Sequence, residues 1–291
     1  MHQLTGGRVP ELDGLRGCAI LLVLIFHFGY GIPGPAPGTF FAYVLAPFVR
    51  LGWSGVDLFF VLSGYLITIS LAQLRSHRDW LRVFYLRRAA RVLPLYAVML
   101  TLFLIGVAAQ STGLIELPRL FGDHRQLWTY FTFAQNDYYA LANADYNWIS
   151  VSWSLAIEEK FYLVFPLLIA IGSKRALSIA LAATIILSIT ARTFGGADWQ
   201  YFFTLCRLDS LAVGAAIALI ALRGQLAGIS RHRLRLAVAL AILGGAILAD
   251  AKWKGIFGCF TFTVFALFYG AILLAALGFG PINRIPKQGI F

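Results

Sequence analysis

GLRGCAILLVLIFH, running from Gly14 to His27, is an apolar run that contains one guanidinium and one imidazole. Arg16 and His27 are eleven residues apart, about three turns of helix, so both side chains face the same way and lie roughly 16 Å apart. Charged and titratable groups inside a membrane helix are costly and are usually functional. The alternative is an arginine that extends to the interface and a histidine hydrogen-bonded to a neighbouring helix.

Apolar runs of this kind recur along the whole chain. The 291 residues are 59% hydrophobic and 13% charged, whereas a soluble domain is typically about 25% charged. The pattern predicts an all-α, polytopic transmembrane helical bundle of about 8–10 spans. The spans are expected at residues 14–31, 53–74, 92–110, 152–171, 176–193, 202–222, 235–250 and 256–279. Residues 127–136 are too short to span and are expected to form a re-entrant or interfacial helix.

The basic residues are distributed unevenly between the loops. Sixteen of the 24 lysines and arginines fall in one set of alternate loops and five in the other. Because cytoplasmic loops are enriched in Lys and Arg, this bias predicts a cytoplasmic N-terminus, with loops 31–52 and 111–151 on the outer face. The net charge of +11 then marks the inner membrane surface, and no nucleic acid partner is expected.

The cysteines argue against a metal site, and the N-terminal sequence argues against a signal peptide. Cys18, Cys206 and Cys259 each stand alone in an apolar run, so we expect packing residues and no metal site. The first apolar run lacks a small-residue cleavage site, which favours a retained helix over a signal peptide.

The second span, GWSGVDLFFVLSGYLI (residues 52–67), contains an acid and a small-residue pair. Asp57 begins the span, and Ser63 and Gly64 interrupt its middle. Asp57 and Gly64 are seven residues apart and share a face, where a small residue lets another helix or a ligand approach. The alternative is a helix-capping aspartate and a glycine packing contact.

FYLRRAARVLPLY (residues 84–96) places three arginines ahead of Pro94, at the predicted cytoplasmic mouth. Arg88 and Arg91 are three residues apart and project to one side of a short helical stretch. Guanidinium groups suit phosphate and pyrophosphate. Ordinary anchoring on anionic lipid is the alternative.

VSWSLAIEEKFYLVFP (residues 151–166) carries two carboxylates and a lysine inside an apolar run. Ser154, Glu158 and Tyr162 line one stripe of a helix, and Glu159 points about 100° away. Glu158 is a candidate general base or a partner for a histidine. The alternative is a Glu–Lys pair that fixes the register of the bundle.

A fourth segment, CRLDSLAVG (residues 206–214), places Arg207 and Asp209 at the start of another span, where a local ion pair is a strong alternative to function. With it, the chain resembles the acyltransferase-3 family of integral-membrane acyltransferases, which modify surface polysaccharides, lipid-linked sugars, Nod factors or secondary metabolites. The matching segments, in family order, are Arg16 to His27, GVDLFFVLSG (55–64), RAAR (88–91), WSLAIEEKFY (153–162) and RLDSLAVG (207–214).

Two departures from the family pattern stand out. Lys160 occupies a position where relatives often carry glutamine. The chain also stops at Phe291 without the late helix that the family usually has. One transmembrane acyltransferase domain over residues 1–291 is therefore expected, either truncated at the C-terminus or a short member of the family.

The resemblance implies transfer of an acyl group, most simply acetyl, from cytoplasmic acetyl-CoA or another acyl-CoA. The acceptor would be a hydroxyl of a sugar or lipid-linked glycan, as in lipopolysaccharide or another surface polysaccharide. The protein would be integral to the bacterial inner (plasma) membrane, in contact with membrane lipid, and would need no metal.

The resemblance also suggests roles for the polar residues. His27 would act as general base or take the acyl group transiently, with Asp57 or Glu158 orienting it. The coenzyme A phosphates would be bound by Arg16, Arg88 and Arg91. The residues expected to contact substrate are Ser63, Trp153, Tyr162 and Glu159.

Two other classes remain open from the sequence. A transporter or flippase for an anionic substrate also buries arginine and glutamate along its pathway, although no repeat of the two halves is visible. A non-catalytic sensor or scaffold would not need both His27 and the arginine pair. Consumption of a thioester distinguishes the enzyme from both.

Overall fold

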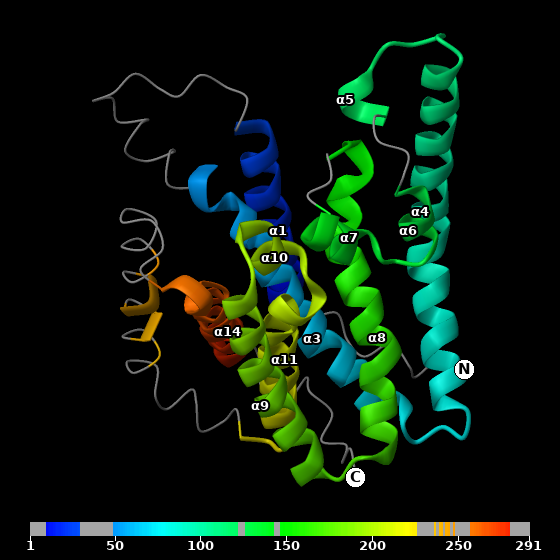
Figure 1. Ribbon diagram of the computed structural model, residues 1–291. Helices are drawn as coiled ribbons and strands as arrows, with labels where there is room; N and C mark the ends of the chain where they lie inside the picture. The colour runs from blue at the N-terminus through cyan, green and yellow to red at the C-terminus, as the bar shows by residue number, and fades with distance from the viewer. Residues whose placement is uncertain are drawn as a thin grey trace.

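A computed structural model of the chain describes residues 10–29, 49–121, 126–142, 146–225 and 257–279, with a few positions between 236 and 247. Every regular element in these ranges is helical (Figure 1). Six of the described helical segments are long and apolar enough to cross a membrane: Pro10–Gly29, Val49–Leu74, Trp80–Ser111, Arg175–Phe194, Ala197–Leu222 and Gly258–Leu277. The prediction of an all-α, polytopic bundle is confirmed.

The long helices follow the predicted spans closely. They are α1 (Pro10–Gly29), α3 (Gly55–Leu74), α4 (Trp80–Ser111), α8 (Trp153–Ile171), α9 (Lys174–Ala191), α11 (Thr204–Leu222) and α14 (Thr261–Phe279). The short helices between them are η1 (Gly52–Ser54), α5 (Pro118–Phe121), α6 (Leu127–Phe131), α7 (Gln135–Ala142), η2 (Trp148–Ser152), η3 (Arg192–Phe194), α10 (Ala197–Phe202) and η4 (Gly258–Phe260). The span predicted at 235–250 lies largely outside the described residues.

Helix α4 is longer than the sequence predicts. We expected a span at 92–110 preceded by a separate basic stretch, but one continuous helix of 32 residues contains both. Pro94 lies inside it, because membrane helices tolerate proline where neighbouring groups satisfy the freed carbonyl. Arg88 and Arg91 therefore lie on the same continuous helix as the apolar span.

Helix α8 has 19 residues, enough to cross the apolar layer. It is not among the six apolar segments, since Glu158, Glu159 and Lys160 follow one another inside it. Buried charges in a helix of this kind need partners or a function.

The sequence predicts one helix over the aromatic segment at 127–136, but the structure differs. The segment is two short helices, α6 and α7, joined by a turn in which Phe133 has a positive φ of 53°. Phe133 stacks on Tyr96 of α4, with ring centroids 4.8 Å apart. Ring stacking thus accompanies a backbone conformation that bulky residues rarely adopt.

Helices α3 and α11 form the centre of the molecule. In the apolar segment that contains α3, 67% of the residues are buried, and in the one that contains α11, 72% are buried. The value for α1 is 11%. The two central helices cross at Gly64 and Gly214: a Cβ on Gly64 would lie 2.0 Å from the carbonyl oxygen of Leu211, and one on Gly214 would lie 1.9 Å from that of Val61. Gly64 is therefore a packing contact between helices.

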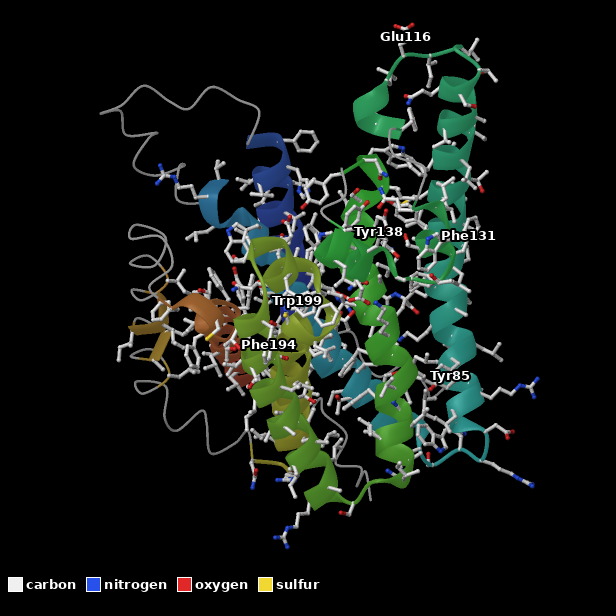
Figure 2. All side chains as sticks on the ribbon, in the orientation of Figure 1. Tyr85, Glu116, Phe131, Tyr138, Phe194 and Trp199 are labelled. Carbon is white, nitrogen blue, oxygen red and sulfur yellow. The ribbon has the colours of Figure 1, made fainter. Side chains whose placement is uncertain are left out.

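The ends of the helices sort into two groups. The α3–α4 turn, the α8–α9 loop and the end of α11 gather at one end of the bundle, and the α4–α5 connection lies at the other (Figure 1). Helix α8 lies next to α4, and Figure 2 shows Tyr85 projecting from α4 beside it, where its hydroxyl donates to the carbonyl of Leu163 at 2.9 Å. Helices α3, α8 and α11 run in the same direction, so their N-terminal halves lie at one level.

Candidate active site

Glu158 is the centre of a partly buried polar cluster between α3 and α8. Ser63 Oγ donates to Glu158 Oε1 at 3.0 Å, and Tyr162 OH donates to Oε2 at 2.6 Å. Tyr162 is one turn after Glu158 on α8, which is why the two side chains meet. Three of the residues expected from the sequence to form the site are thus in direct contact, and both carboxylate oxygens are held in place.

Arg88 completes this cluster from α4. Its guanidinium lies 5.0 Å from the centre of the Tyr162 ring and 5.9 Å from that of Phe84. Electrostatic attraction links it to Glu158 and Glu159. Glu159 is partly buried, and its Oε1 has no hydrogen-bond partner. One cation therefore faces two carboxylates inside the helix bundle, where low polarity strengthens the attraction.

Arg91 lies one turn further along α4. It is exposed and interacts electrostatically with Arg88 and Glu158, yet no ion pair of its own forms in the part of the chain that the structure describes. Its guanidinium has donors free to bind an anion. Arg88 and Arg91 together place positive charge from the buried cluster to the surface of α4.

A second buried cluster contains Asp57 and Arg207. Both side chains are fully buried, with Arg207 Nη2 at 3.1 Å from Asp57 Oδ1. Ser210 Oγ donates to the same oxygen at 3.0 Å. Asp57 was expected to orient His27, but its contacts are with α11, because the glycine crossing brings α3 and α11 together. Trp153 belongs to this second cluster, with its ring 5.8 Å from the guanidinium.

Lys160 has partners other than the neighbouring glutamates. Its Nζ donates to Asn136 Oδ1 at 2.8 Å, to Thr204 Oγ1 at 3.0 Å and to the Asp137 carboxylate. The alternative of a Glu–Lys pair is therefore wrong. Lys160 is two residues after Glu158, about 200° round the helix, so it points to α7 and α11 while Glu158 points to α3.

Arg207 and Asp209 do not pair with each other either. Two residues apart on a helix, they project from nearly opposite sides. Asp209 binds Arg192 instead, and Arg192 also donates to the carbonyls of Cys206 and Cys259, both at 2.8 Å. This second pair ties α9, α11 and α14 together and leaves Arg207 to Asp57.

Helix α1 packs against the start of α3, where a Cβ on Gly55 would lie 2.8 Å from the carbonyl oxygen of Ala19. His27 is exposed, and its Nδ1 lies 2.8 Å from the carbonyl oxygen of Val23. A carbonyl only accepts, so Nδ1 carries the proton and Nε2 of the neutral ring carries the acceptor lone pair. Arg16 pairs with Asp13 at 3.2 Å. Among the described residues, no hydrogen bond or ion pair joins His27 to Asp57 or Glu158.

Sequence reasoning missed the roles of Arg192, Arg207 and Asp137. All three are charged residues in or beside apolar runs, and that signal is visible in the sequence. Their partners lie 17, 150 and 23 residues away, at Asp209, Asp57 and Lys160, so spacing along one helix could not identify them. The described residues contain no cluster of His, Cys, Asp and Glu placed to hold a metal ion.

The fold and these clusters define an integral-membrane protein with a carboxylate–arginine site buried between its helices. Residues 9–290 match the profile of an acyltransferase domain, and the chain belongs to the acyltransferase-3 family. It is 32% identical over 229 residues to the O-acetyltransferase OatA of Staphylococcus aureus. It is 29% identical over 230 residues to a putative peptidoglycan O-acetyltransferase, YrhL, of Bacillus subtilis.

These alignments cover 73% of this chain but only 34% of OatA and 33% of YrhL. The chain therefore aligns with about a third of the length of these relatives. No solved structure matches it.

Proposed function

We propose that the chain transfers an acetyl group from cytoplasmic acetyl-CoA to a hydroxyl of a sugar-containing acceptor at the membrane. The observation that carries the proposal is the cluster of Ser63, Glu158, Tyr162 and Arg88, which combines a held carboxylate with a cation. Family membership supports the acyltransferase class, and the names of the relatives support an O-acetyl product. The peptidoglycan in the name of YrhL supports a glycan acceptor.

The donor would bind along α4. Exposed Arg91 has guanidinium donors for the phosphates of coenzyme A, and Arg88 extends the positive charge to the buried carboxylates. Arg16 joins this proposal with a weaker basis, since it already pairs with Asp13. The positive-inside bias supports a cytoplasmic position for the arginine-rich end.

The reaction requires a base close to the acceptor hydroxyl. The hydroxyl oxygen attacks the thioester carbonyl carbon, a C–O bond forms, the C–S bond breaks, and coenzyme A leaves as the thiolate and takes up a proton. The base that accepts the hydroxyl proton is His27 through Nε2, or Glu158. In a covalent variant, His27 Nε2 takes the acetyl group first and passes it to the hydroxyl. Glu159, Ser63, Trp153 and Tyr162 would contact the substrates.

The first test compares acetyl-CoA turnover by the purified protein and two variants. His27→Gln and Glu158→Gln keep polarity, and each removes one candidate base. Turnover should fall by about 10²–10⁴-fold in the variant whose replaced residue is the true general base. Release of free coenzyme A, with a glycan fragment present, is the measurement. Acetyl label on His27 in a quenched single turnover would identify the covalent variant.

Helix α1 supplies a control for this experiment. Cys18→Ser changes an exposed residue of the same helix that has no role in the proposal, and it should keep full turnover. Turnover that survives in both His27→Gln and Glu158→Gln would contradict the proposed chemistry. A folded wild-type protein that neither binds nor consumes acetyl-CoA would contradict the proposed donor.

A further inference from the structure

Arg207 differs from the other fully buried arginine of the chain. Every nitrogen of Arg192 is hydrogen-bonded: Nε to the carbonyl of Cys206, Nη1 to Cys259 and Thr263, and Nη2 to Asp209. In Arg207, Nε, Nη1 and Nη2 all lack a hydrogen-bond partner, and so does Asp57 Oδ2. The Arg207–Asp57 contact of 3.1 Å is an ion pair between one guanidinium nitrogen and one carboxylate oxygen.

Unsatisfied polar groups are rare inside proteins, because each has lost its water and gained nothing in return. The fold can satisfy a buried guanidinium completely, as it does for Arg192. The free donors of Arg207 and the free acceptor of Asp57 therefore point to a missing polar partner between them.

Four aromatic rings surround the guanidinium, and we call them the aromatic cage. Their centres lie 3.9 Å (Phe262), 5.3 Å (Tyr201), 5.7 Å (Phe60) and 5.8 Å (Trp153) from the central carbon. Tyr201, on the short helix α10, is the partly exposed member, whereas the other three are buried. The cage therefore reaches the surface at Tyr201.

The chemistry of these groups selects a neutral, hydroxyl-bearing partner. Asp57 cancels the charge of Arg207, so the pair has no net charge to attract an anion. A hydroxyl can accept from the guanidinium and donate to the free carboxylate oxygen. The ring carbons of the cage that do not face the guanidinium offer apolar surface for the C–H groups of a sugar ring.

The cage lies close to the cluster around Glu158 along the same helices. Asp57 and Ser63 are six residues apart on α3, and Trp153 and Glu158 are five apart on α8, so the two levels are about 7–9 Å apart. A sugar held in the cage would bring a hydroxyl of the same or the next unit to Glu158.

We propose that Asp57, Arg207 and the aromatic cage bind a sugar ring of the acceptor. This inference rests on the proposed function and adds the place where the acceptor binds. Arg207 and Asp57 hold hydroxyls that are not acylated, and the cage holds the apolar face of the ring. The site selects acceptors by the position of those hydroxyls, while Arg88 and Arg91 bind the donor.

The test measures binding of chitotetraose, an oligosaccharide of N-acetylglucosamine, to the purified full chain by calorimetry. Arg207→Lys keeps the charge but loses the guanidinium fork, and we expect the Kd to rise by about tenfold or more. Phe262→Leu removes one ring without leaving a charge unpaired and should raise the Kd by about three- to tenfold. Arg192→Lys is the matched control: it should lower the melting temperature and leave the Kd unchanged.

Two outcomes overturn the inference. One is no chitotetraose binding by the folded wild-type chain, and the other is the same Kd in wild type, Arg207→Lys and Phe262→Leu. Release of coenzyme A in the same preparations tests the proposed function separately. Sugar binding that depends on Arg207 without release of coenzyme A would reject the transferase activity and keep the sugar site. Release of coenzyme A without such binding would keep the transferase activity and reject the sugar site.

Discussion

Glu158 is partly buried and Arg207 fully buried on neighbouring helices, and their surroundings differ at the level of single atoms. Both oxygens of Glu158 accept a hydrogen bond from a protein hydroxyl, whereas no nitrogen of Arg207 has a hydrogen-bond partner. A carboxylate held in this way is preorganised and keeps further lone pairs for a proton. Unbonded guanidinium donors suit binding. In the proposed function, the cluster around Glu158 carries the chemistry and the cluster around Arg207 binds the acceptor.

Arg87 and Arg91 give a matched pair on one exposed helix. Both are exposed on α4, but only Arg91 interacts with Glu158. We expect Arg91→Ala to raise the Kd of coenzyme A by about 10–100-fold, the loss typical of a charge-assisted hydrogen bond. Arg87→Ala should change it little, since it alters only attraction to lipid. The same change in the coenzyme A Kd for Arg91→Ala and Arg87→Ala would indicate that both residues only anchor the helix in the membrane.

At the scale of helices, two devices position the site. The glycine crossing sets the distance between α3 and α11, which brings Asp57 to Arg207. On α8, Lys160 is tied to Asp137, and Asp137 accepts from the backbone N–H of Thr204 at 2.9 Å, in the first turn of α11. A carboxylate at that end of a helix is favourable. The tie fixes the rotation of α8 and so the direction of Glu158.

The glycine crossing can be tested by adding one methyl group. In Gly214→Ala the new Cβ would meet the carbonyl of Val61, so the helices must separate, and we expect a loss of about 1–3 kcal/mol from overpacking. Gly17→Ala on α1 meets nothing within 4 Å and should gain up to about 1 kcal/mol from helix propensity. Thermal unfolding in detergent compares them, and equal melting temperatures would contradict the close crossing.

At the scale of the molecule, the basic connections between helices are gathered at one end of the bundle (Figure 1). These are the α3–α4 turn with Arg75 and Arg78, the α8–α9 loop with Lys174 and Arg175, and the end of α11 with Arg223. The sequence predicts alternate loops on one side, and the fold agrees with that alternation. Which side faces the cytoplasm is a prediction of the positive-inside bias.

The orientation is measurable by cysteine labelling. In a background without Cys18, Cys206 and Cys259, a membrane-impermeant maleimide on intact cells should modify Leu114→Cys in the exposed α4–α5 connection. Ser76→Cys, exposed in the α3–α4 turn, should react only after lysis. The reverse pattern would place the arginine-rich end outside and would remove the cytoplasmic donor from the proposal.

The sequence by itself determined the helices, the basic ends and the family, since these depend on hydrophobic run length, charge bias and ordered motifs. It also grouped Glu158 with Tyr162, because residues four apart on one helix share a face. Two alternatives that it left open, the Glu–Lys pair and the local Arg207–Asp209 pair, are wrong, and so is the prediction of a basic stretch separate from its span.

Only the tertiary structure decided which buried charges meet across helices. Asp57 finds Arg207, Asp209 finds Arg192, and Lys160 finds Asp137, in each case a partner on another helix. Spacing fixes the direction of a side chain around its own axis, but not which neighbouring helix lies in that direction. That choice follows from the glycine crossing and the rotation of each helix, which depend on packing of the whole bundle.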